Sequence, residues 1–179
     1  MNSGYRITSA RDRDVRLLAA IELAAAKLLI GHAPESVLQE TTSQDVLEKA
    51  QRDGHLWVAL ADDAPVGFAH VEILEPNMAH LAEIDVSPEH GRRGLGTKLV
   101  KRVCEWAAQA GFHSVSLTTF RDVPWNMPFY ARLGFNVVPD SELSPALRGV
   151  VDAEHRRGLD SSRRVVMRRA GTVREVNLR

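Results

Sequence analysis

Residues 86–100, with the sequence Val-Ser-Pro-Glu-His-Gly-Arg-Arg-Gly-Leu-Gly-Thr-Lys-Leu-Val, constrain the fold of this chain more than any other stretch. They read as the end of a β-strand, a tight turn and the start of a helix. Glycine lets the turn approach a ligand closely and adopt positive φ. The first turn of a helix presents unpaired N–H groups at the positive end of its dipole. The stretch therefore predicts an anion site for phosphate or pyrophosphate.

Two common nucleotide-binding signatures are excluded in this stretch. A Walker loop needs Gly-Lys-Ser/Thr, which is absent, and Gly94-Leu95-Gly96 lacks the third glycine of the dinucleotide fingerprint. Arg92 and Arg93 instead add positive charge and planar hydrogen-bond donors to the turn.

Hydrophobic periodicity predicts strands and helices on both sides of this turn. Runs bounded by turn residues predict strands at residues 5–9, 56–61, 66–74, 78–86, 113–119, 135–138 and 163–169. Helices are expected from residue 11 to about residue 30 and at residues 43–52, 94–110, 128–133 and 144–157. Residues 78–86 and 113–119 flank one helix, so a right-handed crossover should make them parallel. An α/β fold follows, with a mixed, twisted sheet of six to seven strands flanked by helices.

Composition is typical of one globular domain spanning residues 1–179. The formal net charge is zero, which argues against a nucleic-acid partner because such partners need a basic surplus. The apolar stretch at residues 15–30 carries Arg16, Glu22 and Lys27, so it predicts no membrane span. No signal peptide is recognisable and Cys104 is the only cysteine, so a cytoplasmic protein without an internal disulfide is expected.

Two motifs carry a resemblance to a known family. Residues 92–97, Arg-Arg-Gly-Leu-Gly-Thr, resemble the acyl-CoA pyrophosphate loop of the GNAT superfamily of N-acetyltransferases. Residues 126–135, Asn-Met-Pro-Phe-Tyr-Ala-Arg-Leu-Gly-Phe, are similar to the closing motif of that family. There are two departures: Gly91 stands where the family usually has Arg or Gln, and Asn126 lies one helical turn before Tyr130 instead of two.

The resemblance implies a single-domain GNAT-like fold with an acetyl-CoA core at about residues 56–138 and splayed parallel central strands. It implies acetyl-CoA as co-substrate and no metal. The pantetheine arm would pair with backbone groups of Ile84 and Val86, and Asn126 would contact the cofactor. The pyrophosphate would bind the loop residues Gly91, Arg92, Arg93, Gly94, Leu95, Gly96 and Thr97.

The implied reaction is transfer of an acetyl group to a primary amine by direct attack in a ternary complex, which needs a base and an acid. The resemblance gives Tyr130 the acid role toward the leaving thiolate. The base is open between two residues. His80 shares the face of Val86 if the strand alternates regularly, whereas Glu83 is the better candidate if the strand is bulged.

Other readings stay open at this point. A non-catalytic acyl-CoA-binding module would bind the same donor without turning it over, and a related enzyme would transfer a longer acyl group. The acceptor is a small-molecule or a peptide amine. Residues 170–179 are expected to be a tail that is either loose or used in assembly, and a homodimer is left open.

Overall fold

The computed structural model describes residues 4–171, which form one seven-stranded mixed sheet with the order β1-β2-β3-β4-β5-β7-β6. The β4–β5 pair is parallel and the other neighbouring pairs are antiparallel. This confirms the predicted α/β fold and the parallel central strands. The strands are β1 (Arg6–Ser9), β2 (Leu56–Ala61), β3 (Ala64–Glu75), β4 (Met78–Val86), β5 (Ser114–Phe120), β6 (Asn136–Val137) and β7 (Arg164–Ala170).

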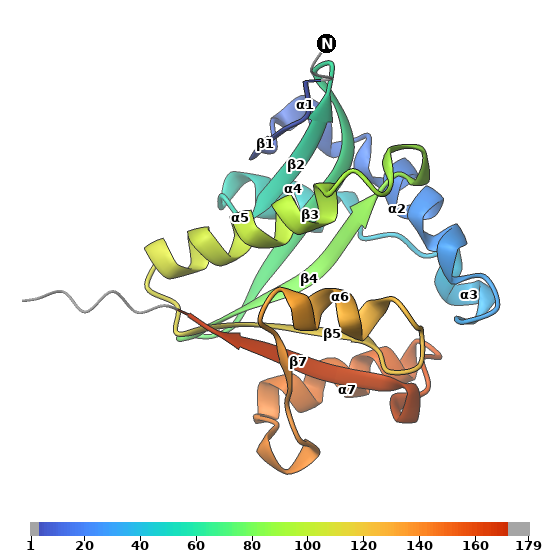
Figure 1. Cartoon of the computed structure of the whole chain (residues 1–179), viewed down its shortest axis with the longest axis vertical. Coiled ribbons are helices and arrows are strands. Elements are labelled where there is room, and N and C mark those ends of the chain that lie inside the picture. Colours follow the sequence, from blue (N-terminus) through green and yellow to red (C-terminus); the bar gives the residue numbers. More distant parts are fainter. Residues whose placement is uncertain (1–3, 172–179) are drawn as a thin grey trace, which may run out of the picture.

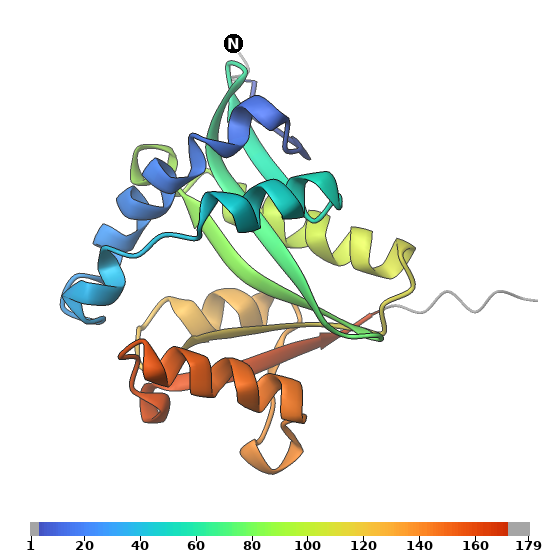
Figure 2. The same ribbon diagram turned by 180° about the vertical axis from the view of Figure 1, so that it is seen from behind.

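Helices cover both faces of the sheet. Figure 1 shows α5 and α6 in front of it, and Figure 2 shows α2, α4 and α7 on the opposite face. The α-helices are α1 (Asp12–Val15), α2 (Leu18–Ala26), α3 (Glu35–Leu38), α4 (Gln44–Arg52), α5 (Leu95–Gln109), α6 (Asn126–Arg132) and α7 (Pro145–Arg156). Short 3₁₀ turns lie at Lys27–Leu29, Pro88–His90, Asp140–Glu142 and Ser161–Arg163. Within residues 4–171, no helix combines the length and the apolar character needed to cross a bilayer.

The core follows the alternation of side chains along the strands. In β2, Trp57 and Ala59 pack in the cluster beneath α5, whereas Leu56, Val58 and Leu60 pack beneath α1, α2 and α4. Because both faces of this strand are covered, it is apolar along almost its whole length.

Several details differ from the sequence-based expectations, among them α3, where no helix was predicted, and β6, which is shorter than the expected strand. The helix expected from residue 11 is split into α1, α2 and short turns. Helix α6 begins at Asn126, two residues before its expected start, with Trp125 at its N-cap, so Pro128 is its third residue. Proline fits there because N–H groups in the first helical turn have no intrahelical partner. Strand β7 includes Ala170, so the expected tail starts later, and residues 172–179 lie outside the described residues.

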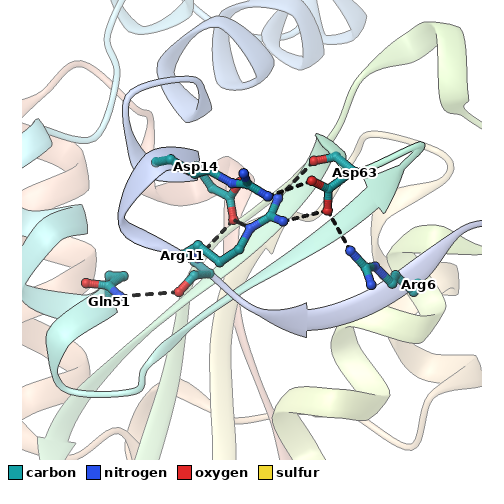
Figure 3. Close-up of polar contacts among 7 residues, drawn as sticks. Arg6, Arg11, Asp14, Gln51 and Asp63 are labelled. Atoms are coloured by element: carbon teal, nitrogen blue, oxygen red, sulfur yellow. Dashed lines mark hydrogen bonds and ion pairs between the residues drawn. The ribbon is translucent and has the colours of Figure 1, made fainter.

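A polar network ties β1 and α1 to the β2–β3 turn (Figure 3). The Asp63 carboxylate accepts hydrogen bonds of 2.6 Å from Arg6, Arg11 and Arg13. Arg11 also donates to both carboxylate oxygens of Asp14, each at 2.8 Å. The network holds β1 and α1 against the β2–β3 turn, and α2 follows α1 along the same face of the sheet.

The central strands separate along their length. Pairing between β4 and β5 covers Met78↔Ser114, Ala79↔Val115 and His80↔Ser116 and goes no further. Both strands nevertheless continue, to Val86 and Phe120. From residue 81 onward, the side of β4 that faces β5 therefore has no strand partner among the described residues.

Candidate active site

The glycine-rich loop forms the turn between β4 and α5. Gly94 is the N-cap of α5 and has the left-handed backbone conformation at φ 74°. Arg92 also has positive φ, at 57°, which is uncommon for a residue with a side chain. The turn exposes the N-terminal N–H groups of a 15-residue helix. The turn and the start of the helix lie where the sequence predicts them, and anion binding there stays a prediction.

A cleft of about 1040 Å³ runs from this loop to the separated ends of β4 and β5. Most of the predicted cofactor residues line it: Ile84, Val86, Gly91, Arg92, Gly94, Leu95, Gly96, Thr97 and Asn126. Arg93 is not among the lining residues. Its guanidinium lies over the Tyr5 ring, 5.7 Å from the centroid.

Strand β4 contains a bulge at the level of the cleft. Glu83 pairs with His70 of β3, and Leu81 pairs with Val71, so Ala82 is the extra residue. The expectation that His80 shares the face of Val86 is therefore wrong, because one extra residue inverts the alternation. His80 and Glu83 instead line the same cavity, while Leu81, Ile84 and Val86 pack toward the α5 cluster.

The bulge brings three carboxyl groups together. Oxygen atoms of Glu22 from α2 and of Glu83 and Asp85 from β4 lie within 4.8 Å of one another. Glu22 is fixed by Thr42, whose backbone N–H donates to its two oxygens at 3.0 and 2.9 Å. Asp85 Oδ2 is buried and has no hydrogen-bond partner among residues 4–171.

Burial raises the pKa of each carboxyl group in this cluster, and for Glu83 and Asp85 the charge of neighbouring carboxylates raises it further. Desolvation together with the charge of Glu22 raises the pKa of Glu83 to about 7. Desolvation and the charges of Glu83 and Glu22 raise the pKa of Asp85 well above its usual range. A carboxyl group with a pKa near neutrality can accept a proton from a substrate and release it again.

His80 has a different environment. Its side chain is buried, and its Nδ1 lies 2.9 Å from Ser116 Oγ, the partner at the last rung of the β4–β5 ladder. Desolvation lowers the pKa of His80 to about 4. The ring is therefore neutral near pH 7 and a weak base.

Tyr130 projects from α6 toward the carboxyl cluster. Its ring packs edge-on against Phe129 and Phe135, with centroid distances of 4.9 and 6.0 Å. Burial, followed by the negative charges of Glu83 and Asp85, raises the pKa of Tyr130 above its ordinary value. The hydroxyl therefore stays protonated at neutral pH and lies within electrostatic range of both carboxyl groups.

A second cavity of about 660 Å³ meets the cleft at the bulge. Five residues line both spaces: Ala82, Glu83, Thr118, Glu154 and Arg157. The second cavity continues between α2, α4 and α7 and is lined further by Glu22, Glu40, Thr42, Val46, Glu72 and His80, among others. The two spaces together give access to the carboxyl cluster from both faces of the sheet.

A buried ion pair braces the junction between the two spaces. Arg164 of β7 donates to both Glu154 oxygens, each at 2.9 Å, and to Thr118 Oγ1 at 3.0 Å. The Thr118 hydroxyl in turn donates to Glu154. The Arg164 and Glu154 side chains are only 9% and 12% exposed, so the brace, which we define as Thr118, Glu154 and Arg164, is shielded from solvent.

Sequence reasoning missed several of these residues. In the sequence, Glu22 only interrupts an apolar stretch, Glu154 lies in a segment expected to be helical, and Asp85 lies in a segment expected to be a strand. The sequence alone assigns none of the three a role at the site. Only a tertiary contact brings α2 to β4 and α7 to β7, so no local spacing signals these groups.

Comparison with known proteins agrees with this architecture. The family model described as "Acetyltransferase (GNAT) family" matches residues 23–135. An uncharacterized N-acetyltransferase of Methanocaldococcus jannaschii is 33% identical over 95 residues, which are 50% of this chain and 42% of that protein. The match thus spans less than half the length of this curated relative.

Solved structures share the fold at low sequence identity. The PaiA N-acetyltransferase of Thermoplasma acidophilum, in complex with coenzyme A, is 18% identical with a TM-score of 0.72, covering 93% of this chain and 99% of that one. The ribosomal-protein-S18-alanine N-acetyltransferase of Escherichia coli is also 18% identical, with a TM-score of 0.67 and coverage of 98% and 99%. N-acetylglutamate synthase of Neisseria gonorrhoeae, with coenzyme A and N-acetyl-glutamate, is 18% identical with a TM-score of 0.71, covering 95% of this chain and 36% of that one. Together with a family model that spans most of the chain, the splayed sheet and its glycine-rich loop lead to one conclusion: this chain belongs to the acetyltransferase (GNAT) family.

Proposed function

We propose that this chain is a cytoplasmic, acetyl-CoA-dependent N-acetyltransferase that acts on a primary amine by direct attack in a ternary complex. One observation carries the proposal. The cleft that begins at the glycine-rich loop ends where β4 and β5 separate, at a carboxyl group with a raised pKa and a protonated tyrosine. The residues proposed to bind the acetyl donor and those proposed to transfer protons therefore line the same cleft.

The residues along the cleft fit acetyl-CoA. N–H groups at the start of α5 and the Arg92 guanidinium suit a pyrophosphate, because both supply donors and positive potential. Backbone groups near Ile84 and Val86 lie on the separated part of β4 and suit the amides of an extended chain. Asn126 lines the same cleft from the first turn of α6.

Glu83 is assigned as the general base and Tyr130 as the general acid. Glu83 takes a proton from the acceptor ammonium, and the neutral amine nitrogen then attacks the thioester carbonyl. As the C–N bond forms and the C–S bond breaks, Tyr130 donates its proton to the leaving sulfur, and the extra proton of the acylated nitrogen then returns to the tyrosine oxygen, so that the amide is neutral and Tyr130 is protonated again. A base with a pKa near the working pH is most effective, and the pKa of Glu83, at about 7, meets that condition.

His80, the other candidate base, is assigned a positioning role. Its lowered pKa makes it a poor proton acceptor at neutral pH, and its hydrogen bond to Ser116 ties it to the point where the strands part. The bulge at Ala82, two residues after His80, sets the direction of the Glu83 side chain. His80 therefore helps to position Glu83 by fixing β4 next to the bulge, and it does not accept the substrate proton.

The test combines binding with turnover. Calorimetry should give saturable acetyl-CoA binding, and a thiol-release assay with a panel of primary amines should give free coenzyme A together with an N-acetyl product. Binding without turnover of any amine would indicate the non-catalytic module instead. Faster turnover with a longer acyl donor, measured with the same amine, would replace the acetyl assignment.

A further inference from the structure

The 660 Å³ cavity is acidic although the whole chain has a net charge of zero. Its lining contains five glutamates and a single arginine, and its two histidines, His70 and His80, have pKa values lowered to about 4 by burial. Both rings are therefore neutral near pH 7. Acidic side chains therefore outnumber basic ones in this lining by five to one, although the numbers are equal in the whole chain.

Ion pairs neutralise only part of that charge. Glu40 pairs with Arg157 at 2.7 Å, and Glu154 belongs to the brace. Glu22, Glu72 and Glu83 form no ion pair with any basic side chain in residues 4–171. Asp85, whose buried Oδ2 has no hydrogen-bond partner in residues 4–171, lines the donor cleft and not this cavity.

The unpaired carboxyl groups occupy two positions. Glu83 lies at the junction with the donor cleft, where the reacting amine is expected, and a Glu22 oxygen lies within 4.8 Å of it. Glu72 lies farther along β3, two residues from His70, the strand partner of Glu83. At the usual rise of a strand, this places Glu72 about 7 Å from the His70–Glu83 pair. It is exposed at the edge of the cavity.

The rest of the lining suits an alkyl chain. The side chains beside the acidic groups are short or apolar: Thr41, Thr42, Val46, Ala82, Val150 and Ala153. The Glu40–Arg157 ion pair joins the segment before α4 to the end of α7, and both residues line the cavity. A volume of about 660 Å³ is in the usual range for a small-molecule site.

We infer that the acceptor is a small aliphatic diamine, whose reacting amine lies at Glu83 while its second ammonium is held by Glu72. The inference rests on the proposed acetyltransferase function. One nitrogen is acetylated and loses a proton, so the products are the mono-N-acetylated diamine, which keeps one ammonium, free coenzyme A and one proton released to solvent. An acceptor with a carboxylate is disfavoured, because Arg157, the one basic residue of the lining, is already paired with Glu40.

Three acceptors of equal carbon-chain length test this inference: 1,4-diaminobutane, 1-aminobutane and 4-aminobutanoate. They differ only in whether the far end carries an ammonium, a methyl group or a carboxylate. We expect kcat/KM with 1,4-diaminobutane to exceed that with 1-aminobutane by at least about tenfold, with 4-aminobutanoate the poorest. The advantage of the diamine should shrink as NaCl is raised, because salt screens the attraction.

Glu72→Gln identifies the group that recognises the second charge. It should raise KM for 1,4-diaminobutane and reduce the ratio of kcat/KM for diamine to monoamine toward one. Each amine has the same basicity whether it is tested with the wild type or with Glu72→Gln. A change in the diamine-to-monoamine ratio of kcat/KM therefore measures the effect of the Glu72 carboxylate. Glu75→Gln is the matched control, since this residue of the same strand lines neither cavity, and the ratio should not change.

The outcomes separate this inference from the function on which it rests. Equal or better turnover of the monoamine or the amino acid would overturn the diamine assignment and leave the acetyltransferase in place. An unchanged ratio in Glu72→Gln would remove Glu72 from recognition. Saturable acetyl-CoA binding with no turnover of any amine would overturn both, because no acceptor would then exist.

Discussion

His70 and Glu83 are direct partners across the β3–β4 ladder, although the next rung joins Val71 to Leu81. Skipping Ala82 directs Glu83 and Asp85 to the face that carries Glu22, and directs Ile84 and Val86 toward α5. Alternation alone separates Glu83 and Asp85 from Ile84 and Val86, and the inserted residue sets which face of the sheet each pair takes. The proposed role of Glu83 as the base depends on that placement.

Replacing Glu83 with Gln should remove the general base while keeping the shape of the side chain. We expect kcat to fall by about a hundredfold or more, the usual range for a lost general base. The base acts when ionised, so wild-type activity should drop as the pH falls through about 7, the pKa of Glu83. The charged groups that face Glu83 are Glu22 from α2, Asp85 beside it, and Arg157 from α7.

The comparison variant for this prediction is His80→Gln, which removes the ring but keeps a polar side chain beside Ser116. It should retain the fall in activity near pH 7, because His80 titrates near 4. If His80→Gln abolished that fall and Glu83→Gln preserved it, the assignment of the base to Glu83 would be wrong.

Most helices and strands can be predicted from the sequence, because hydrophobic periodicity and turn residues within each segment determine them. Residues 78–86 are mostly apolar and bounded by turn signals, and β4 has these bounds. The helix after the glycine-rich loop ends within two residues of its expected end, because Gly111 has the positive φ that stops a helix.

The candidate site is less predictable because it depends on register and tertiary contacts. The pattern of side chains in residues 78–86 does not show where a bulge lies. The sequence alone therefore could not decide between His80 and Glu83 as the general base. Glu22 and Arg164 lie far along the chain from β4, and only the packing of α2 and β7 brings them to the site. Arg93 is part of the loop motif, yet its guanidinium lies over the Tyr5 ring and Arg93 does not line the cleft.

Gly94→Asp should abolish acetyl-CoA binding with the fold retained. A Cβ at Gly94 meets open space, so the side chain fits, but it adds a negative charge at the N-cap of α5, beside the proposed pyrophosphate. Gly111→Asp is the matched control. It has a similar φ of 86° and open space at the other end of α5, so it carries the same backbone strain without touching the cleft. Calorimetry that gave both variants equal affinity for acetyl-CoA would contradict the loop assignment.

The brace should be a major contributor to stability. Replacing Arg164 with Met leaves the Glu154 carboxylate buried without its partner, and we expect a loss of about 3–5 kcal/mol in the free energy of unfolding. The double variant Arg164→Met with Glu154→Gln should recover part of that loss, because no unpaired charge remains.

The neighbouring ion pair between Arg163 and Asp122 serves as the reference for the brace. The Asp122 side chain is 49% exposed, so Asp122→Asn should cost no more than about 1 kcal/mol. Urea unfolding would measure all four proteins. Equal losses for Arg164→Met and Asp122→Asn would show that burial of the brace has no energetic consequence.

Tyr130→Phe tests the proton donor. The variant keeps the ring that packs against Phe129 and Phe135, so acetyl-CoA affinity should change little. Turnover should fall by about ten- to a thousandfold, because the leaving thiolate loses its acid. The loss should shrink with an acyl donor whose thiol is more acidic, since that leaving group needs less help. Trp125→Phe, at the N-cap of the same helix, controls for disturbance of α6 and should keep that dependence on thiol acidity unchanged. Wild-type turnover in Tyr130→Phe, measured where the chemical step limits the rate, would remove Tyr130 from the mechanism.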